Sequence, residues 1–586
     1  MLKTLAASVR EYKKPALLTP VYVIFEVILD CIIPFLIAEL VNRISAGAEL
    51  NVILGYGGVL AVMALLSLLF GTLAAFSCSD AACGFAKNLR HDIFARIQGF
   101  SFENIDRFST SSLVTRLTTD ISNIQFAYMM IIRTAIRSPL MLVFSFVMAF
   151  IMGGNMAWIF VFVIPVLGTG LYIVSKKAMP RFRAVFKKYD NLNNSIQENI
   201  KGIRVVKSFV REDYEQNKFN NAAEDVCRDF TVAERIVAVN GPLMQFCLYA
   251  VMVFTLSFGS YMIISSSGLD LDVGQLSAML TYSFMMLNSL MMLSMIFVMI
   301  TMADESAKRV CEVLTEKNTL TNPENPVYDV KDGSIDFDGV SFKYSKTAKR
   351  NALENINLHI NSGETIGIVG GTGSSKSSLI QLISRLYDAT EGVVKVGGVD
   401  VRSYDLDTLR NNVAVVLQKN LLFSGTIKEN LRWGDENATD EEIVEACRLA
   451  CADEFVETFP QKYDTYIEQG GANVSGGQKQ RLCIARALLK KPKILILDDS
   501  TSAVDTKTDA KIRAALKKYI PQTTKIIIAQ RTASVEDADK IIVMDAGKIV
   551  AFGTHDELLK TNDIYREIYT SQNKAESDRK AGEANA

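Results

Sequence analysis

Six long apolar stretches occupy the first half of the chain, and they constrain its fold more than any other feature. They lie near residues 16–43, 51–77, 126–152, 156–176, 241–265 and 276–302. A helix needs roughly 20 residues to cross the hydrocarbon core of a bilayer, and each stretch is long enough to do so. Since lipid offers backbone groups no hydrogen-bond partner, these stretches are predicted to be transmembrane helices.

Composition separates this first half from the rest of the chain. Hydrophobic residues make up 49% of the 586 residues, but they concentrate in roughly the first 300 positions. A chain this long predicts several domains. The net charge of −1 gives no sign of a nucleic-acid partner. The nine cysteines form no CxxC pair and there are only three histidines, so reduced core cysteines are expected rather than disulfides or a metal centre.

Lys and Arg are distributed unevenly among the connections between the apolar stretches. The connections 44–50, 153–155 and 266–275 contain neither residue, whereas 87–125 and 176–238 are rich in both. Basic loops stay on the cytoplasmic side, so both termini and the two long connections are predicted to be cytoplasmic. The sequence "GGN" at 153–155 predicts a tight turn between antiparallel helices.

The second long connection is predicted to be helical. Residues 176–235 keep an apolar period and contain one proline, Pro180. A helix from 156 to about 200 would be roughly 65 Å long at ~1.5 Å per residue, about twice the thickness of the hydrocarbon. It is therefore expected to extend well into the cytoplasm.

The first residues combine charged side chains with Leu2, Leu5, Val9 and Tyr12 at roughly helical spacing. This spacing favours a short helix on the membrane surface over residues 1–14, with a frayed terminus as the alternative. No short apolar segment with a cleavage site follows, so a removed signal peptide is not expected.

Four charged residues lie inside predicted spans, where charge is costly. Glu26 and Asp30 are four apart in the first span, and Arg133 and Arg137 are four apart in the third. Counted from the outer ends of their helices, the two pairs lie at matching depths, so they can neutralise one another as an ion-pair ladder. The alternative interpretation is that Glu26 or Asp30 faces a wet cavity and selects a cationic substrate.

The sixth span carries seven methionines between Met285 and Met302. Methionine is flexible and polarizable, which suits a surface that accepts many apolar shapes. Ordinary packing or contact with lipid is the alternative interpretation.

The second half of the chain has a different pattern. A polar stretch at 315–334 with two prolines predicts a linker. From Ile335, short runs such as "TIGIVG", "NVAVVL", "KILILD" and "KIIIAQ" alternate with helical segments. This alternation predicts an α/β domain with a mostly parallel sheet flanked by helices.

The first of these strands ends in a glycine-rich loop that leads into a helix. The loop reads Gly370, Gly371, Thr372, Gly373, Ser374, Ser375, Lys376, Ser377 and Ser378. Backbone N–H groups of such a loop can wrap phosphate at a helix N-terminus. Lys376 would reach the terminal phosphates, and Ser377 would ligate Mg²⁺. The pattern calls for Gly at position 375, and a Ser Cβ there crowds the approach of backbone to phosphate.

Five further motifs accompany this loop. They are "VSFKY" with Tyr344, "VVLQKNLLFSGTIKENL" with Gln418, "VSGGQKQR" (Val474–Arg481), "ILILDDS" with Asp498 and Asp499, and "SAVD" (Ser502–Asp505). With these motifs the chain resembles, over nearly its whole length, one half of an ABC transporter of the exporter type (type IV fold). Considered alone, Tyr344 could be an ordinary aromatic residue of a strand and Gln418 an ordinary polar residue of a loop. The fixed order of the motifs along the chain argues against this interpretation.

The resemblance implies ATP and Mg²⁺ as cofactors. Tyr344 is expected to stack on adenine, and Gln418 and Asp498 to join Ser377 around Mg²⁺. In this family two ATP-binding domains sandwich ATP head to tail, so the signature of one chain completes the site of the other. The signature residues here are Ser475, Gly476, Gly477 and Gln478. The turns near 100–112 and 204–214 resemble coupling helices, the second of which docks on the partner chain.

Two further departures join Ser375 at the same site. Asp499 stands where the family has the Glu that acts as base toward the attacking water, and Gln530 stands where it has a His that contacts the γ-phosphate. Asp is one methylene short, and a general base must lie within roughly 2.6–3.2 Å of its proton's owner. Gln cannot carry the charge of an imidazolium. The three changes indicate a degenerate site that holds ATP and hydrolyses it slowly.

The fold class is therefore a membrane all-α domain of six transmembrane helices with long cytoplasmic extensions, followed by an α/β P-loop ATP-binding domain with a helical subdomain. The predicted divisions are a surface helix at 1–14, the transmembrane domain at 15–315, a linker at 316–334, the ATP-binding domain at 335–572 and a disordered tail at 573–586.

The predicted function is that of one half of a heterodimeric ABC exporter, a multi-pass translocase of a bacterial plasma membrane with its ATP-binding domain in the cytoplasm. Its partners would be a second half-transporter, membrane lipid and an apolar or amphipathic substrate of multidrug, lipid or peptide type, with no nucleic acid. Turnover would reside mainly in the site shared with the partner. The alternatives are an ATP-gated channel or regulatory subunit, and an exporter-fold importer of a small chelated nutrient.

Overall fold

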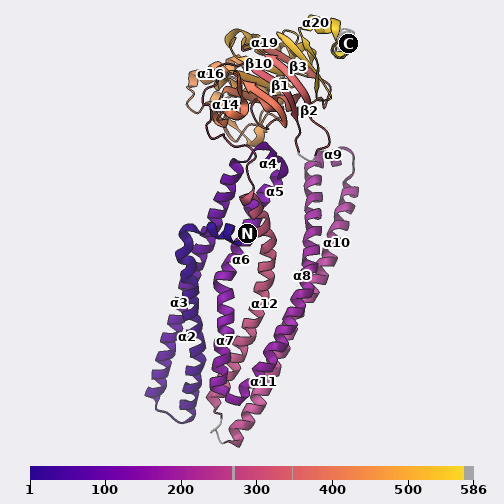
Figure 1. Cartoon of the computed structure of the whole chain (residues 1–586). Helices are drawn as coiled ribbons and strands as arrows, with labels where there is room; N and C mark the ends of the chain where they lie inside the picture. Colours follow the sequence, from indigo (N-terminus) through magenta and orange to yellow (C-terminus); the bar gives the residue numbers. More distant parts are fainter. Residues whose placement is uncertain (267–270, 346–347, 573–586) are drawn as a thin grey trace. The chain divides into compact units, whose positions relative to one another are not determined.

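The chain is described here from a computed structural model, and the described residues are 1–266, 271–345 and 348–572 (Figure 1). The tail predicted at 573–586 lies outside them. The chain divides into two compact units. The first, the membrane unit, is Met1–Gly99 with Phe108–Glu316, and the second, the ATP-binding unit, is Phe100–Arg107 with Lys317–Ala586.

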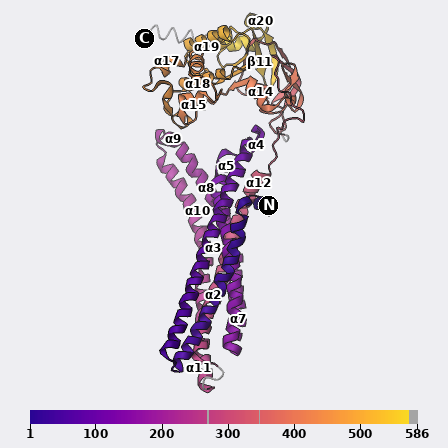
Figure 2. The same cartoon turned by 90° about the vertical axis from the view of Figure 1, so that its left-hand side faces the viewer.

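The membrane unit is helical in its described residues. Its elements are α1 (Leu2–Ala7), η1 (Arg10–Tyr12), α2 (Lys13–Ser45), α3 (Leu50–Gln98), α5 (Thr110–Thr115), η2 (Arg116–Asp120), α6 (Ile121–Met129), η3 (Met130–Thr134), α7 (Ala135–Gly153), η4 (Gly154–Ala157), α8 (Trp158–Lys201), α9 (Ile203–Ser208), α10 (Glu212–Ala238), α11 (Asn240–Ser265) and α12 (Val273–Thr315). The turns η2 and η3 are π-helical. Helix α2 packs along α3, and α8 lies beside α10 (Figure 1, Figure 2).

The long helix predicted from 156 to about 200 is confirmed. Helix α8 has 44 residues, which at ~1.5 Å per residue gives a length of about 66 Å. The chain turns at α9 and returns through α10. The tight turn predicted at 153–155 is also confirmed, because Gly154 has φ +50° and ψ −123° and leaves the helix there.

Within the described residues, five continuous helical stretches are long and apolar enough to cross a membrane, rather than the six predicted. They are Arg10–Ser45, Leu50–Gln98, Thr110–Phe182, Glu212–Ser265 and Val273–Thr315. The third stretch contains two of the predicted spans, 126–152 and 156–176, with Gly154 between them. This count does not confirm the number six.

Of the predicted ion-pair ladder, the part formed by Arg137 is present. Arg137 Nη2 lies 2.9 Å from Asp30 Oδ2 and 3.4 Å from Glu26 Oε1, so one arginine holds both carboxylates. Among the described residues, Arg133 forms no ion pair within 4.0 Å. The pairing expected from residue numbers requires a regular α-helix. Arg133 instead lies in the π turn η3, whose i→i+5 hydrogen bonds change the direction of its side chain relative to Arg137.

The ATP-binding unit contains the predicted, mostly parallel sheet. Its strand order is β12-β11-β3-β10-β9-β6, with only β12 antiparallel to its neighbour. These strands are β3 (Thr365–Gly370), β6 (Val413–Val416), β9 (Ile494–Asp498), β10 (Thr524–Ile528), β11 (Lys540–Asp545) and β12 (Lys548–Gly553). A four-stranded antiparallel sheet, β2-β1-β4-β5, packs with it, and a short pair, β7-β8, lies apart.

The remaining strands and helices of this unit surround these sheets. The strands are β1 (Ile335–Phe342), β2 (Leu353–Ile360), β4 (Glu391–Val396), β5 (Val399–Asp400), β7 (Gly425–Thr426) and β8 (Tyr466–Ile467). The helices are α4 (Phe102–Arg107), α13 (Lys376–Ile383), α14 (Leu406–Asn412), α15 (Ile427–Leu431), α16 (Asp440–Leu449), α17 (Asp453–Val456), α18 (Gly476–Leu489), α19 (Thr506–Tyr519) and α20 (His555–Thr561), with short 3₁₀ turns η5 (Val401–Ser403), η6 (Lys462–Asp464), η7 (Gln469–Gly471) and η8 (Thr532–Ser534).

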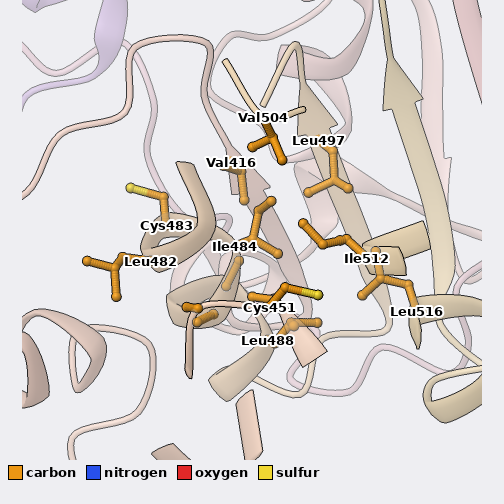
Figure 3. Close-up of a cluster of buried hydrophobic side chains, with 14 of the residues drawn as sticks. Val416, Cys451, Leu482, Cys483, Ile484, Leu488, Leu497, Val504, Ile512 and Leu516 are labelled. Carbon is orange, nitrogen blue, oxygen red and sulfur yellow. The ribbon is translucent and has the colours of Figure 1, made fainter. Parts of the chain in front are cut away.

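One apolar core joins the central strands of the sheet to the helices that follow the signature. Ile484 and Leu488 of α18, Leu497 of β9 and Ile512 of α19 belong to this one buried cluster (Figure 3). All four side chains are nearly or fully buried. Burial of this apolar area fixes α18 against the strand that ends in the two acidic residues.

Helix α4 belongs to the ATP-binding unit, although the long helices on both sides of it in the sequence belong to the membrane unit. The Tyr387 hydroxyl donates to Asp106 Oδ2 at 2.5 Å, and the rings of Phe102 and Tyr387 lie 6.1 Å apart. Asn104 Nδ2 also donates to the carbonyl of Lys317 at 3.0 Å. Within the turn predicted near 100–112, residues 100–107 are therefore attached to this unit by both polar and aromatic contacts.

Candidate ATP-binding site

The phosphate loop connects β3 to α13. Its glycines are required for different structural reasons. At Gly370, which has φ +155°, an added Cβ would lie 2.2 Å from the carbonyl oxygen of Met544, so no side chain fits there. At Gly371 and Gly373 an added Cβ would meet nothing within 4 Å. The backbone at these two positions is thus open on the side where a phosphate approaches.

Ser375 holds a backbone conformation that favours glycine. It precedes α13 with φ +70° and ψ +27°, in the left-handed region. For a residue with a Cβ this conformation costs about 1–2 kcal/mol. The departure noted in the sequence therefore has a structural consequence, because the loop keeps the glycine conformation without the glycine.

Ser375→Gly is expected to stabilise the ATP-binding unit by about 1 kcal/mol, because it removes the left-handed strain at the cost of some chain entropy. The measurement is the thermal midpoint of the full-length protein, in the transition that shifts on addition of ATP. Ser374→Gly is the matched control, since Ser374 is not at positive φ and its hydroxyl accepts a bond from Lys376. A lower midpoint for Ser375→Gly than for the unaltered chain contradicts the strain argument.

The Lys376 side chain curls back over its own loop. Its Nζ donates to the carbonyl oxygens of Gly370 and Gly371 at 2.8 and 2.9 Å, and to Ser374 Oγ at 3.3 Å. Burial lowers the pKa of Lys376, and the carboxylates of Asp498 and Asp499 counter that shift. An incoming phosphate would replace neutral carbonyls with charged acceptors, which are the stronger partners for an ammonium group.

Two acidic side chains stand at the end of β9, beside this lysine. Asp498 is the last residue of the strand, and burial raises its pKa, whereas a hydrogen bond from Ser377 lowers it. Burial also raises the pKa of Asp499, which is 9% exposed. The structure therefore brings Ser377, Asp498 and Lys376 together, as the sequence predicts for a site that takes phosphate and Mg²⁺.

The Asp499 carboxylate is held by two side-chain amides. Gln530 Nε2 donates to Asp499 Oδ2 at 2.8 Å, and Gln418 Nε2 approaches the same oxygen at 3.4 Å. Asp499 itself has φ +50°. The two residues that depart from the family pattern at this end of the site, Asp499 and Gln530, are thus direct partners. The two amide hydrogen bonds oppose the rise in the pKa of Asp499 that burial causes, and they occupy the oxygen that would otherwise accept a hydrogen from water.

Tyr344 lies against the helix that follows the phosphate loop. Its hydroxyl is 2.8 Å from Ser378 Oγ and donates to Gln381 Oε1 at 3.0 Å. Its ring meets the ring of Tyr387 edge-on, with centroids 5.2 Å apart at 87°. The side chain is 44% exposed, so one part of the ring is accessible to a ligand. Sequence reasoning did not single out Tyr387, which joins this ring to α4.

The signature residues form the N-terminus of α18. Ser475 Oγ accepts from Gln478 N at 3.3 Å, and Gln478 Oε1 accepts from Ser475 N at 2.8 Å, which is a capping box. An added Cβ at Gly477 would lie 2.8 Å from the Ala503 carbonyl oxygen, whereas at Gly476 it would meet only Ala503 Cβ, at 3.5 Å. Within the described chain, no hydrogen bond of Ser475 or Gln478 reaches the phosphate loop.

A second connection ties the signature helix to Asp499. Gln480 Nε2 donates to Ser502 Oγ at 3.1 Å, and Gln480 Oε1 accepts from Ala503 N at 2.9 Å. Ser502 Oγ in turn donates to the carbonyl of Asp499 at 3.0 Å. The "SAVD" loop therefore joins the end of β9 to α18 inside one chain.

The switch loop has one partner that sequence reasoning missed. Gln572 Nε2 donates to the Gln530 carbonyl at 2.8 Å, and Gln572 Oε1 accepts from the backbone N–H and the hydroxyl of Thr532, at 2.8 and 3.0 Å. A glutamine this far along the sequence has no motif around it, so only the folded chain identifies it.

The residues present fit ATP with Mg²⁺. The loop offers open backbone at two glycines, a lysine in reach of phosphate, and a buried acid paired with a hydroxyl. Ser377, Asp498 and Gln418 would hold the metal ion, which would bridge phosphate oxygens and offset their charge. At the end of β9, the Asp499 carboxylate already accepts hydrogen bonds from two side-chain amides.

Comparison with known families agrees with this site. The family described as the ABC transporter transmembrane region matches residues 17–290, and the family described as ABC transporter matches residues 353–502. The first match covers α2 to the middle of α12, and the second includes the phosphate loop, the signature and both acidic residues.

Whole-chain relatives support the same assignment. The uncharacterized ABC transporter ATP-binding protein YfiB of Bacillus subtilis (strain 168) is 36% identical over 547 residues, which cover 93% of this chain and 94% of that protein. An uncharacterized ABC transporter ATP-binding protein of Mycobacterium tuberculosis (strain CDC 1551 / Oshkosh) is 34% identical over 577 residues, 98% of each chain.

A solved structure shares the fold. The structure of a bacterial Atm1-family ABC exporter with ATP bound has a TM-score of 0.82 and 22% sequence identity, and the match covers 97% of this chain and 99% of that one. The family matches, the relatives and the phosphate loop with its acidic partners agree, and the chain therefore belongs to the ABC transporter family, with the transmembrane region and the ATP-binding domain in one polypeptide of exporter-type fold.

Proposed function

We propose that this chain is one half of a heterodimeric ABC exporter in which its own phosphate-binding site is degenerate. The site binds ATP and Mg²⁺ but hydrolyses ATP slowly, and the signature loop at Ser475–Gln478 completes the active site of a partner half-transporter. Turnover resides mainly in that partner site, and it drives export of an apolar or amphipathic compound.

The observation that carries the proposal is the bond between Asp499 and Gln530. A catalytic carboxylate must reach a water molecule, yet Asp499 Oδ2 already accepts from Gln530 at 2.8 Å and Gln418 at 3.4 Å. The capping box of the signature, in contrast, is complete, with Ser475 exposed and Gln478 half-buried. A poor base at Asp499 together with an intact signature supports the proposal that this chain contributes more to hydrolysis at the partner's ATP site than at its own.

A groove on the ATP-binding unit suits a helix from a partner. It has a volume of about 310 Å³, and it runs between the Gln418 loop and α18. The rings of Phe423 and Trp433 stack there 4.2 Å apart at 9°, and both are exposed. In the exporter family that this sequence resembles, the second coupling helix of each chain docks on the ATP-binding domain of the other chain. The partner's second coupling helix would therefore dock in this groove.

The membrane unit supports six spans with cytoplasmic termini. The helical stretch Thr110–Phe182 counts as two spans if the chain reverses at Gly154. The basic connections 87–125 and 176–238 then lie on the same side as both termini, and by the positive-inside rule this favours an ATP-binding unit on the cytoplasmic side of a bacterial plasma membrane.

The test is to purify the tagged full-length chain from its native membranes and identify what is retained with it. We expect a second half-transporter in a one-to-one ratio, with Asp-Glu at the end of its Walker B strand and a His at its switch position. A protein that contains only copies of this chain, and that transports and hydrolyses ATP at full rate, contradicts the proposal.

A further inference from the structure

A cavity inside the membrane unit differs in charge from the one expected from the sequence. It has a volume of about 390 Å³. Its lining includes three charged side chains, Asp30, Arg133 and Arg137. Since Glu26 is not part of the lining, the walls carry two cations and one anion. The cationic substrate considered from the sequence requires an acid that is free, so the partners of Asp30 decide its chemistry.

Asp30 is fully engaged. Its Oδ2 lies 2.9 Å from Arg137 Nη2, and its Oδ1 accepts from Ser67 Oγ at 2.7 Å. Arg137 also reaches Glu26 Oε1 at 3.4 Å. A carboxylate with both oxygens bonded to α3 and α7 is a structural ion pair, and it offers little to a cationic ligand.

Arg133 is in the opposite situation. It is half-buried at the same cavity and, among the described residues, it has no carboxylate within 4.0 Å and donates no hydrogen bond. An arginine inside a predicted span costs free energy unless it is paired or hydrated, so an unpaired one marks a site that another group fills. It also lies in the π turn η3, and such turns are frequent at functional sites.

The opposite wall of the cavity comes from α12. Asn288 is half-buried there and has no hydrogen-bond partner within the described chain. Met285, Met292 and Phe284 supply flexible or aromatic apolar surface around it. The cavity therefore combines an unpaired guanidinium and an unpaired amide with an apolar wall that accepts several shapes.

We propose that this cavity binds an amphipathic substrate that carries one acidic group. The carboxylate, sulfonate or phosphate oxygens accept from Arg133 and Asn288, and the apolar body lies against Met285 and Met292. A guanidinium suits such a group because its N–H donors match two oxygens at once. This inference rests on the proposed export function and adds the charge class of the compound exported.

The first test uses the unaltered full-length chain in phosphatidylcholine nanodiscs without ATP. The probes are dansylglycine, which is anionic, dansylglycinamide, which is neutral, and dansylcadaverine, which is cationic. Fluorescence titration, corrected for empty nanodiscs, is expected to give at least tenfold tighter binding of the anion than of either other probe. Equal affinities, or a preference for the cation, overturn the proposal.

Substitutions locate the binding group. Arg133→Gln is expected to abolish the preference for dansylglycine, and Arg133→Lys to retain part of it. The matched control is Arg235→Gln, because Arg235 is exposed near the end of α10, away from this cavity. The thermal midpoint of each variant is measured alongside. If Arg133 serves only as a distant counter-charge to Glu26, Arg133→Gln lowers the midpoint and leaves the probe preference intact, which contradicts the proposal.

Phosphatidylglycerol in the nanodiscs distinguishes two sources of the same acidic chemistry. Competition with dansylglycine assigns the cavity to an anionic lipid headgroup, and the absence of competition assigns it to a soluble amphiphile; both agree with an anion site. Because these measurements need no nucleotide, a failure here leaves the ATP asymmetry standing. A failure of the co-purification experiment, in turn, leaves the probe preference standing.

Discussion

Replacement of Asp499 by Glu together with Gln530 by His is expected to raise the ATP turnover of the purified chain at least tenfold. The longer side chain adds one C–C bond, ~1.5 Å, to the reach of the carboxylate. The second change removes the amide that now donates to Asp499 Oδ2 at 2.8 Å. General base catalysis typically contributes 10²–10⁴-fold, so partial recovery of the geometry is enough for this rise. The measurement is phosphate release at saturating ATP.

The control for this experiment is the same double variant with Lys376→Ala, which removes the phosphate-binding ammonium and should return turnover to the background. Each single substitution is measured as well, since the two residues are bonded and their effects are not expected to add. Brisk turnover by the unaltered chain alone, or no rise in a double variant that still binds ATP, removes the basis for calling the site degenerate.

Gly477→Asp in this chain is expected to lower the turnover of the complex with its partner at least 100-fold. A side chain at this position meets the Ala503 carbonyl oxygen at 2.8 Å, so the signature must shift. The new carboxylate would also oppose a phosphate near the N-terminus of α18. The measurement is phosphate release by the co-purified complex, with retained ATP binding as evidence that the domain is folded.

The matched variant is Asp499→Asn in the same chain, which keeps the size of the side chain and removes its ability to act as a base. Turnover of the complex is expected to stay within about twofold, because the proposed working site uses this chain's signature and not its acid. If Asp499→Asn stops turnover while Gly477→Asp does not, the assignment of the two sites is reversed.

The aromatic contacts near Tyr344 show how the ATP site connects to α4. Tyr387 meets the Tyr344 ring edge-on at 5.2 Å, and its hydroxyl donates to Asp106 of α4 at 2.5 Å. The ring expected to stack on adenine and the turn expected to act as a coupling helix are therefore two contacts apart. A change in the Tyr344 side chain on nucleotide binding would act directly on a residue that holds α4.

Much of the fold was predictable because its signals are local. Apolar length identified the membrane-spanning stretches, and the alternation of strands and helices indicated the parallel sheet that β3, β6, β9, β10 and β11 form. Spacing also identified the phosphate loop and the acids after β9. These features depend on neighbouring residues in the chain, and backbone hydrogen bonding alone turns them into structure.

The number of spans and the ion pairs were less accessible from the sequence. The expected pair of Arg137 with Asp30 is present, but Glu26 is also held by Arg137 and not by Arg133, because Arg133 lies in the π turn η3 and is out of step with Arg137. A single extra residue in a helical turn shifts the phase of the residues that follow it, but in the nearly uniformly apolar stretch 126–152 this shift is hard to see in the sequence.

The sequence by itself indicated that this chain spans a membrane, carries an ATP-binding domain, and has Asp499 and Gln530 where the resemblance to ABC exporters implies Glu and His. Only the tertiary structure decided that these two side chains bond to each other, that Ser375 keeps a left-handed backbone, and that, among the residues described, Asp30 has an ion-pair partner while Arg133 has none. The physical reason is that motifs depend on residues that are neighbours in the sequence. The contact partner of a side chain depends instead on segments that are distant in the sequence and that only tertiary packing brings together.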